Sequence, residues 1–175
     1  MGKPETKWYR RDLGDEHPEP SQVEIELKDA TTEDGFESFV RTHMEAFGER
    51  PDKETFELYR LDVNDGVIHK DRMFTFLRNG APSGCVSFSV MKKPDGSEFI
   101  LLDNLGVPVS LQGNGLGYTT LSLLLSRLRG SFDPETLVLC DVWAGNRASR
   151  AILEKLGFQE IEQESWFPLP PEAGD

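Results

Sequence analysis

The sequence predicts an α/β (α+β) fold, in which a mixed, mostly antiparallel central sheet is flanked by about four helices. Three observations lead to this expectation. Segments with strand character are joined by short turns, Asn79-Gly80 and residues 94–96 (PDG), which is typical of antiparallel strands. After the glycine-rich stretch at 113–117, a helix and another apolar strand follow, which indicates a right-handed crossover. A chain of 175 residues divided into two cores would leave each one marginal, so we expect a single domain.

The N-terminal half of the predicted domain contains one strand, two helices and three further strands. Residues 23–27 (VEIEL) alternate strictly between apolar and acidic side chains, which indicates a half-buried strand. Thr31 or Thr32 is suited to cap a helix with one apolar stripe, and Gly48 ends that helix. Pro51 opens a second helix. The three strands that follow are expected over residues 72–78, 85–91 and 99–107.

The C-terminal half changes character after the glycine-rich turn. The leucine-rich segment 121–128 indicates a largely buried helix, and the apolar residues 137–142 suit a central strand. A second helix is expected over residues 147–155 and is stopped by Gly157. The last predicted strand covers residues 159–167 and leads into a proline-rich end.

Both ends of the chain are expected to lie outside the domain. Residues 1–21 are rich in Pro, Glu, Asp and Arg and show no period, so we expect an N-terminal extension that is flexible or lies on the surface. Within it, the pair Trp8-Tyr9 is suited to anchor the extension either on its own domain or on a second subunit. The domain is expected over residues 22–170, with a short tail at 171–175.

The composition excludes several classes of partner. With 19 basic and 31 acidic side chains, the chain has a net charge of −12, which opposes nucleic-acid binding because phosphates must be neutralised by Lys and Arg. The same charge either favours a cationic acceptor or serves solubility. No apolar run reaches the about 18 residues that cross a bilayer, and the first residues lack the apolar segment of a secretion signal. Cys85 and Cys140 lie in apolar runs without CxxC spacing, so we expect buried thiols, no metal site and a cytoplasmic location.

The segment between one predicted strand and the next helix is a glycine-rich turn, Gln112-Gly113-Asn114-Gly115-Leu116-Gly117. The unpaired N–H groups and the positive dipole end of such a helix start suit a phosphate, and glycine lets the backbone approach it closely. A Walker loop is excluded because Tyr118-Thr119 stands where Lys-Ser/Thr is required. A dinucleotide-binding fingerprint is excluded because its third glycine position is also Tyr118.

The turn matches the pattern Q/R-x-x-G-x-G and resembles the pyrophosphate loop of the GNAT superfamily of acetyl-CoA-dependent N-acetyltransferases. Residues 103–107 (DNLGV) resemble the fourth strand of that family, and residues 146–158 (NRASRAILEKLGF) resemble its asparagine-to-EKLGF segment. The resemblance extends over residues 23–167. It implies a GNAT-like fold in which the fourth and fifth strands of the sheet splay apart.

The resemblance also implies that acetyl-CoA is the co-substrate, with its pantetheine arm in the gap between the splayed strands, and that no metal is required. By position, Val107 and Val109 would give main-chain contacts to the arm, whereas Pro108 has no N–H to donate. Asn146 would bind the arm near its thiol end, cap the following helix, or do both. The implied cofactor-binding residues are Leu105, Val107, Val109, Gln112, Gly113, Asn114, Gly115, Leu116, Gly117 and Asn146.

Asp103 is the candidate catalytic residue, as a general base or as an anchor for the amine. Strand alternation places it on one face with four apolar side chains, those of Phe99, Leu101, Leu105 and Val107. A carboxylate on an apolar face is costly unless it has a partner or a function, and burial would raise its pKa towards a useful value. The resembled family often carries an acidic residue here. The alternative is a structural aspartate bonded to the nearby backbone.

Leu153 is where the sequence departs from the resembled family. The usual general acid there is a tyrosine immediately before the EKLGF segment, and leucine has no proton to give. Tyr118 or Tyr59 would have to replace it, or water protonates the thiolate, or the thiolate leaves unaided. We therefore expect an enzyme that acetylates a primary amine of a small molecule or peptide, with a non-catalytic acyl-CoA-binding protein as the alternative. A purely interacting module would need an apolar surface or charged stripe that the sequence does not clearly show.

The sequence does not identify the acceptor. The first two predicted helices and their linker carry acidic side chains that indicate either a solvated face or a site for a cationic amine. These residues are Glu45, Glu49, Asp52, Glu54 and Glu57. Trp143 and Trp166 are candidates either for the acceptor pocket or for the core. Because only one final strand is expected, the sheet has an uncovered edge that a partner subunit in a homodimer would complete.

Overall fold

The computed structural model describes residues 5–19 and 25–168, so the expected domain boundaries and the C-terminal tail lie outside the described residues. The strands are β1 (Thr6–Asp12), β2 (Ile25–Asp29), β3 (Met73–Arg78), β4 (Ala81–Lys92), β5 (Glu98–Gly106), β6 (Leu137–Trp143) and β7 (Gln159–Ile161). The helices are α1 (Glu33–Ala46), α2 (Lys53–Asn64), α3 (Leu116–Arg129) and α4 (Arg147–Lys155), with short 3-10 helices at Lys70–Arg72 and Val109–Leu111.

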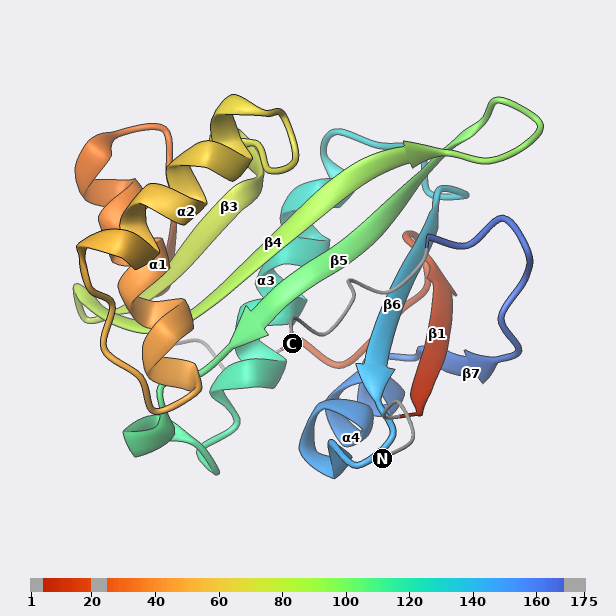
Figure 1. The fold of residues 1–175 in the computed structure, drawn as a ribbon. Coiled ribbons are helices and arrows are strands. Elements are labelled where there is room, and N and C mark those ends of the chain that lie inside the picture. The colour runs from red at the N-terminus through yellow and green to blue at the C-terminus, as the bar shows by residue number, and fades with distance from the viewer. Residues whose placement is uncertain (1–4, 20–24, 169–175) are drawn as a thin grey trace.

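The seven strands of the described chain form one sheet in the order β2-β3-β4-β5-β6-β1-β7 (Figure 1). Neighbouring strands are antiparallel, with one exception. β5 and β6 run parallel because α3 crosses over between them. The predicted antiparallel sheet with one crossover is therefore confirmed. The Asn79-Gly80 turn joins β3 to β4 with φ angles of 51° and 75°, the left-handed pair that a tight hairpin requires.

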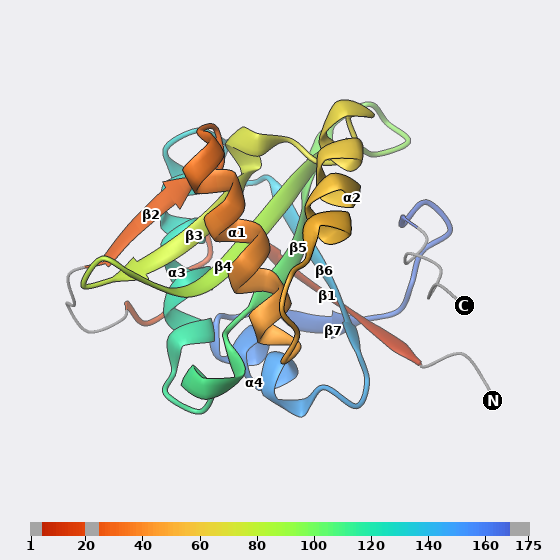
Figure 2. The same cartoon turned by 60° about the vertical axis from the view of Figure 1, so that its left-hand side comes forward.

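The helices lie on both faces of the sheet (Figures 1 and 2). On one face, α3 and α4 cover the main core, in which Leu121 and Leu124 pack against strand residues such as Ile100. On the other face, α1 places Phe36 and Phe39 in a smaller core over β3 and β4. The carboxyl ends of β5 and β6 thus have helices on either side of them, and the candidate site lies there.

The N-terminal segment departs most from the expectation. Residues 6–12, predicted as part of an extension that is flexible or lies on the surface, form β1 inside the sheet, antiparallel to both β6 and β7. Trp8 and Tyr9 are 3% and 0% exposed and enter the cores on opposite faces. Buried Arg11 donates to the carbonyl of Leu156, which ends α4. A strand inside a sheet is buried on both faces, so its sequence does not alternate between apolar and polar residues. The basic residues of β1 made its strand character still harder to recognise in the sequence.

β1 lies between β6 and β7, so the C-terminal strand β7 does not pair with β6. The strand predicted over residues 159–167 is wrong beyond Ile161, because residues 162–168 form turns and irregular structure and pack on the sheet through Trp166 and Phe167. There Phe167 packs on Trp8 with ring centroids 4.9 Å apart, and Trp166 packs edge-on against Phe99 at 5.3 Å. Trp166 is therefore a core residue rather than a pocket residue. At this side of the sheet, the edge strand among the described residues is β7, which has three residues and so offers little backbone for pairing. The homodimer stays a prediction.

Candidate active site

The parallel strands β5 and β6 separate into a split at their carboxyl ends. Four residue pairs join them, from Phe99 with Leu137 to Leu102 with Cys140, and the ladder ends there. Both strands continue beyond the last pair and diverge (Figure 1). The expected splay between these two strands is therefore present.

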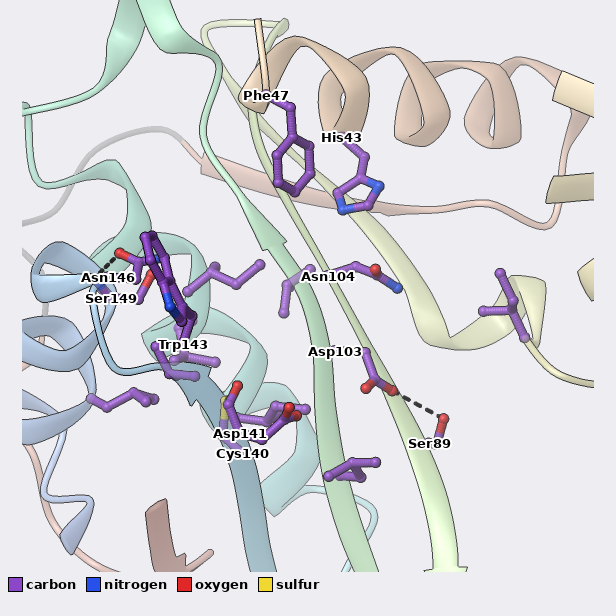
Figure 3. Close-up of a pocket in the computed structure, with 18 of the residues that line it drawn as sticks. His43, Phe47, Ser89, Asp103, Asn104, Cys140, Asp141, Trp143, Asn146 and Ser149 are labelled. Atoms are coloured by element: carbon purple, nitrogen blue, oxygen red, sulfur yellow. Dashed lines mark hydrogen bonds between the residues drawn. The ribbon is translucent and has the colours of Figure 1, made fainter. Parts of the chain in front are cut away.

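A cavity of about 660 Å³ occupies the split (Figure 3). Its lining includes Leu121 of α3 and Leu153 of α4, which lie over one face of the sheet, and His43 of α1 and Tyr59 of α2, which lie over the other. The cavity therefore lies at the split between β5 and β6 and is bordered by helices from both faces of the sheet.

A β-bulge in β5 shapes one wall of this cavity. Asn104 has a left-handed φ of 49°, its Nδ2 donates to Ser87 Oγ at 2.9 Å, and the pairing register with β4 shifts at this point. A bulge inserts one extra residue and so reverses the alternation of side chains beyond it. Leu105 consequently packs with the main core beneath α3, and Val107 lies against α3. The prediction that these two side chains share a face with Asp103 is therefore wrong.

Asp103 is the first residue of β5 beyond the paired ladder, and it lines the cavity. It lies before the bulge and so shares a face with Phe99 and Leu101, as predicted. Ser89 Oγ donates to its Oδ2 at 3.2 Å. Burial raises the pKa of the Asp103 carboxyl to about 6, the Ser89 hydrogen bond opposes this shift, and the charge of Asp141 adds to it. At pH 7 such a carboxyl is ionised, yet basic enough to accept a proton.

Asp141 is a second carboxylate at the split, which the sequence analysis did not single out. It holds on β6 the place that Asp103 holds on β5, directly after the last residue pair of the ladder. Burial raises its pKa as well, and none of the described side chains donates a hydrogen bond to its carboxylate. The signal was present in the sequence, because the segments ILLD and VLCD both end in aspartate and parallel strands bring their carboxyl ends together.

The wall that α1 and α2 contribute carries three aromatic rings and one carboxylate, that of Asp62. The Nδ1 atom of His43 shares a hydrogen bond with the Tyr59 hydroxyl, and the His43 ring lies edge-on to Phe47 at 5.3 Å. Burial lowers the pKa of His43 to about 4 and raises the pKa of Tyr59 to about 12, so both rings are neutral at pH 7. Tyr59, one of the two predicted replacement acids, is thus inside the cavity, with its hydroxyl already engaged.

The other predicted replacement acid, Tyr118, does not line the cavity. Its hydroxyl donates to the carbonyl of Pro18, and the Lys155 ammonium lies 4.5 Å from the centroid of its ring. Leu153 does line the cavity and is 1% exposed. Asn146 lines it too and caps α4, since its Oδ1 accepts from the backbone N–H of Ser149 at 3.1 Å.

The glycine turn is open to solvent where it begins α3. Gly113 and Gly115 have left-handed φ angles of 84° and 74°, and a Cβ atom at either would meet no atom within 4 Å. Gly115 is the N-cap of α3, and no described side chain caps this helix start. Gln112 holds the turn in place, because its Nε2 donates to the carbonyl of Val107 at 3.0 Å and to that of Ala46 at 3.3 Å. The first N–H groups of α3 are therefore left to water or to a ligand.

The remaining residues of the turn and its flanks range from exposed to buried. Val109 is exposed in the short helix before the turn, and Asn114 Nδ2 donates to the carbonyl of Leu111 at 3.0 Å. Leu116 is buried in the first turn of α3. A Cβ atom at Gly117 would lie 2.7 Å from Ile152 Cδ1, so a larger residue there would require the Ile152 side chain to shift.

The two cysteines lie beside the split and are not paired with each other. Cys85 is buried, as predicted, whereas Cys140 is half-buried and lines the cavity, and burial raises the pKa of both thiols. Within residues 5–19 and 25–168, no three His, Cys, Asp or Glu side chains are grouped so as to hold a metal ion. No helix in the same ranges has the length and apolar character needed to cross a bilayer.

Residues 32–158 match the model of the family described as Acetyltransferase (GNAT) family. This match covers more than half of the chain and includes the glycine turn, the split and α4. The chain therefore belongs to the GNAT acetyltransferase family, as its resemblance indicated. No curated protein matches the sequence.

Solved structures of GNAT acetyltransferases share this fold. An acetyltransferase from Colwellia psychrerythraea superposes with a TM-score of 0.64 at 16% identity over 90% of the chain, which spans 53% of that protein. An aminoglycoside N-acetyltransferase in complex with CoA gives 0.60 at 15% identity, with 86% and 97% of the two chains covered. An acetyltransferase from Trypanosoma brucei gives 0.57 at 20% identity, with 83% and 100% covered. At these identities the likeness shows the fold alone.

Proposed function

We propose that this protein is an acetyl-CoA-dependent N-acetyltransferase that moves an acetyl group to the primary amine of a small molecule or peptide by direct attack. The observation that carries the proposal is the cavity at the β5–β6 split, with the half-buried Asp103 in its wall. Direct transfer requires that donor and acceptor meet without a covalent enzyme intermediate, and a cavity between the diverging strands offers one space in which they would meet. Membership of the GNAT family supports acyl transfer in general.

The residues around the glycine turn fit a diphosphate. Gly113 and Gly115 leave space above a helix start that no described side chain caps, and the backbone N–H groups there would bind the diphosphate of acetyl-CoA. The turn residues that would take part are Gln112, Gly113, Asn114, Gly115, Leu116 and Gly117. The bound co-substrate supplies the activated acetyl thioester.

An extended arm fits the split itself. The main chain of Leu105, Val107 and Val109 would bind the pantetheine arm, with Pro108 unable to donate. Asn146 uses its Oδ1 to cap α4, which leaves its Nδ2 to bind the arm. These roles follow the resemblance position by position, and each is part of the proposal.

Asp103 would prepare the amine for attack. The amine nitrogen must be neutral when it forms the new C–N bond with the thioester carbonyl, and at pH 7 most alkylamines are protonated. The Asp103 carboxylate would accept that proton or hold the amine in position, while Ser89 orients its Oδ2 atom. The C–S bond of the thioester then breaks, CoA leaves as a thiolate, and the nitrogen releases its second proton to water as the amide forms.

The leaving thiolate has no tyrosine to protonate it, because position 153 is a leucine. Tyr59 is within the cavity, but its hydroxyl shares a hydrogen bond with His43 and its pKa of about 12 makes it a weak acid. A thiol has an ordinary pKa of about 8.5, so its thiolate is a tolerable leaving group near neutral pH. We propose that water protonates it after it leaves.

Leu153 also favours a second candidate function, that of a non-catalytic acyl-CoA-binding protein. A chain that has lost a general acid but kept an open glycine turn would bind acyl-CoA without turning it over. The two functions differ in one observable, the release of free CoA in the presence of an amine.

The experiment that tests the proposal has two parts. Calorimetry with acetyl-CoA measures binding, and a thiol reagent measures CoA release with a panel of primary amines. Binding with amine-dependent release supports the enzyme, and binding without release for every amine supports the second candidate. An absence of binding would contradict both functions.

A further inference from the structure

Among the described residues, the charged side chains that line the cavity are all acidic. They are Asp62, Asp103 and Asp141, and neither lysine nor arginine occurs among the lining residues. The acidic side chains of the first two helices, which the sequence analysis considered for an amine site, are exposed and lie outside the lining: Glu45, Glu49, Asp52, Glu54 and Glu57. The cavity therefore favours a cationic acceptor and repels an anionic one. The carboxylates that would contact an acceptor are those of Asp103 and Asp141 on the strands and of Asp62 on α2.

Asp103 and Asp141 project to the same face of the sheet. Leu101 and Leu139 are register partners, and each is two residues before one of the aspartates on its own strand. Alternation along β6 puts Asp141 on that face together with Trp143. Neither carboxylate has an ion-pair partner among the described residues, and both are half-buried. Two such carboxylates are costly when both are ionised, and a cation bound between them removes that cost.

The mouth of the cavity on the same face is apolar. Phe47, Val67 and Trp143 are 67%, 65% and 59% exposed, and all three line the cavity. They come from three elements, the end of α1, the segment after α2 and the end of β6, and Figure 3 shows Phe47 and Trp143 on different sides of the space between the strands. Large apolar side chains exposed around a cavity mark a contact surface for an apolar ligand.

Each of the two aromatic side chains of this rim contacts a neighbour on one side. A Cβ atom at Gly145 would lie 2.8 Å from Trp143 Cζ2, so the indole ring lies directly on this glycine. On the other side, the Phe47 ring contacts His43, whose own position is set by Tyr59. Fixed aromatic surfaces bind a planar apolar group at a low cost in side-chain entropy.

We infer that the acceptor is a monocationic primary amine with an aromatic body, whose nitrogen lies between Asp103 and Asp141 and whose ring lies between Phe47 and Trp143. This inference rests on the proposed function and names its substrate class. Asp141 is then a positioning residue that binds the ammonium group, while Asp103 accepts the proton. Polyamines and amino sugars fit less well, because their further cations and hydroxyls would face the apolar side chains of Phe47, Val67 and Trp143.

A matched panel of amines tests the substrate class with the wild-type protein. We expect kcat/KM for 2-phenylethylamine to exceed that for 1,4-diaminobutane and for glucosamine by about tenfold or more, since burial of an apolar group commonly gives discrimination of this size. Calorimetric titration of 2-phenylethylamine into the CoA-saturated protein gives a second measurement that does not depend on turnover.

Two variants test the residues. Trp143→Ala should raise KM for 2-phenylethylamine about tenfold and leave KM for 1,4-diaminobutane and for acetyl-CoA nearly unchanged. Asp141→Asn should raise KM for every amine while KM for acetyl-CoA stays the same, and Asp141→Glu should restore part of the affinity. Glu49→Gln removes an exposed acid that does not line the cavity, and it should match the wild type.

The outcomes separate the inference from the function on which it rests. Turnover that is fastest with diamines or amino sugars would overturn the inference and leave the acetyltransferase function standing. Binding of 2-phenylethylamine to the CoA-loaded protein without turnover would support the inferred site and contradict the catalytic proposal. Failure of the CoA-loaded protein to bind this amine, or an Asp141→Asn variant with unchanged amine KM, would overturn the inference.

Discussion

Asp103 and Asp141 directly follow Leu102 and Cys140, the last residue pair that joins the parallel strands β5 and β6. The ladder brings the two aspartates level with each other and then ends, so they stand at the point where the sheet opens into a cavity. The negative charge of Asp141 contributes to the raised pKa of Asp103. The same backbone feature thus forms the cavity and makes one of its carboxylates a better base.

Replacement of Asp103 by asparagine should lower turnover by about 10²-fold or more, because the amide keeps the shape of the side chain and cannot accept a proton. Affinity for CoA should be unchanged, since the glycine turn is untouched.

The pH dependence of kcat/KM gives a second test of Asp103. With the wild type, kcat/KM should fall as the pH drops below about 6, where Asp103 becomes protonated, and Asp103→Asn should lack this fall. Asp141→Asn should move it to lower pH, since the charge that raises the Asp103 pKa is gone. An Asp103→Asn variant as active as the wild type at every pH would leave Asp103 a structural role only.

Gly115→Glu should abolish binding of acetyl-CoA, because the new carboxylate would stand where the diphosphate is expected. The matched control is Gly80→Glu. Both glycines have a left-handed φ, 74° and 75°, with no atom within 4 Å of an added Cβ, so backbone strain costs the two variants about the same. Calorimetry should show CoA binding by the control and none by Gly115→Glu. Equal affinity in both variants would remove the glycine turn from the proposed cofactor site.

Trp8→Ala should destabilise the protein by about 3–5 kcal/mol, the usual cost of truncating a large buried aromatic side chain. Trp8 is 3% exposed in β1 and packs on Phe167. Trp143→Ala is the control, because this tryptophan is 59% exposed and its loss should cost less than about 1 kcal/mol. Urea denaturation measures both. A Trp8→Ala variant as stable as the control would mean that β1 contributes little to the sheet in solution.

The sequence predicts most elements of this fold because local patterns decide them. Thr32 caps α1 by accepting from Gly35 N at 3.1 Å, as its side chain and position indicate, and Asn79-Gly80 forms the expected hairpin turn. β1 was not predictable in this way, because its strand character depends on partners more than a hundred residues away.

The candidate site was predictable to the extent that short motifs determine it. The glycine turn, Asp103 and Asn146 all lie where the motifs place them, at a helix start or beside the split. The register of the parallel ladder brings Asp141 beside Asp103, and a register between distant strands is not encoded in any short segment. The bulge at Asn104 depends on a single left-handed residue, and this one conformation reverses the faces of Leu105 and Val107.

His17 lies in the segment after β1 and forms hydrogen bonds to α3 that require its ring to be neutral. Its Nδ1 lies 3.2 Å from Arg11 Nη1 and 3.3 Å from Arg129 Nη2, and its Nε2 lies 2.9 Å from Ser122 Oγ. Guanidinium groups only donate hydrogen bonds, so Nδ1 accepts and the Nε2–H donates to Ser122. Burial, followed by the charges of Arg11 and Arg129, lowers the pKa of His17.

This lowered pKa predicts that His17→Gln makes stability less sensitive to acid. As the pH falls below the ordinary histidine pKa of 6.5, the unfolded chain binds a proton at His17 before the folded protein does, so the free energy of unfolding decreases. His43, with a pKa of about 4, acts in the same direction, and Asp103, with a raised pKa, acts in the opposite one. Both remain in the variant, so the difference between the two proteins reports on His17. Urea denaturation at about pH 7.5 and about pH 5 measures it, and an equal loss in both proteins would contradict this assignment.

Leu153→Tyr tests whether the missing general acid limits the reaction. Leu153 follows Asn146 by about two turns of α4, and both residues line the cavity, so a phenol at this position should reach the split. Leu153 is 1% exposed, and the larger side chain should therefore cost about 1–3 kcal/mol of stability. Leu153→Phe is the matched control, because it adds the ring without the hydroxyl.

If the thiolate now leaves without a proton donor, Leu153→Tyr should raise kcat by up to about tenfold over Leu153→Phe, less than general acids usually contribute. The gain should disappear near the pKa of a phenol, about 10, because the ionised hydroxyl no longer donates. The measurement is kcat against pH for both variants and the wild type, with the best amine found. Identical profiles for the tyrosine and phenylalanine variants would mean that thiolate departure is not limiting or that another group protonates it. Tyr59 would then be the residue to change, since it lines the cavity and Tyr118 does not.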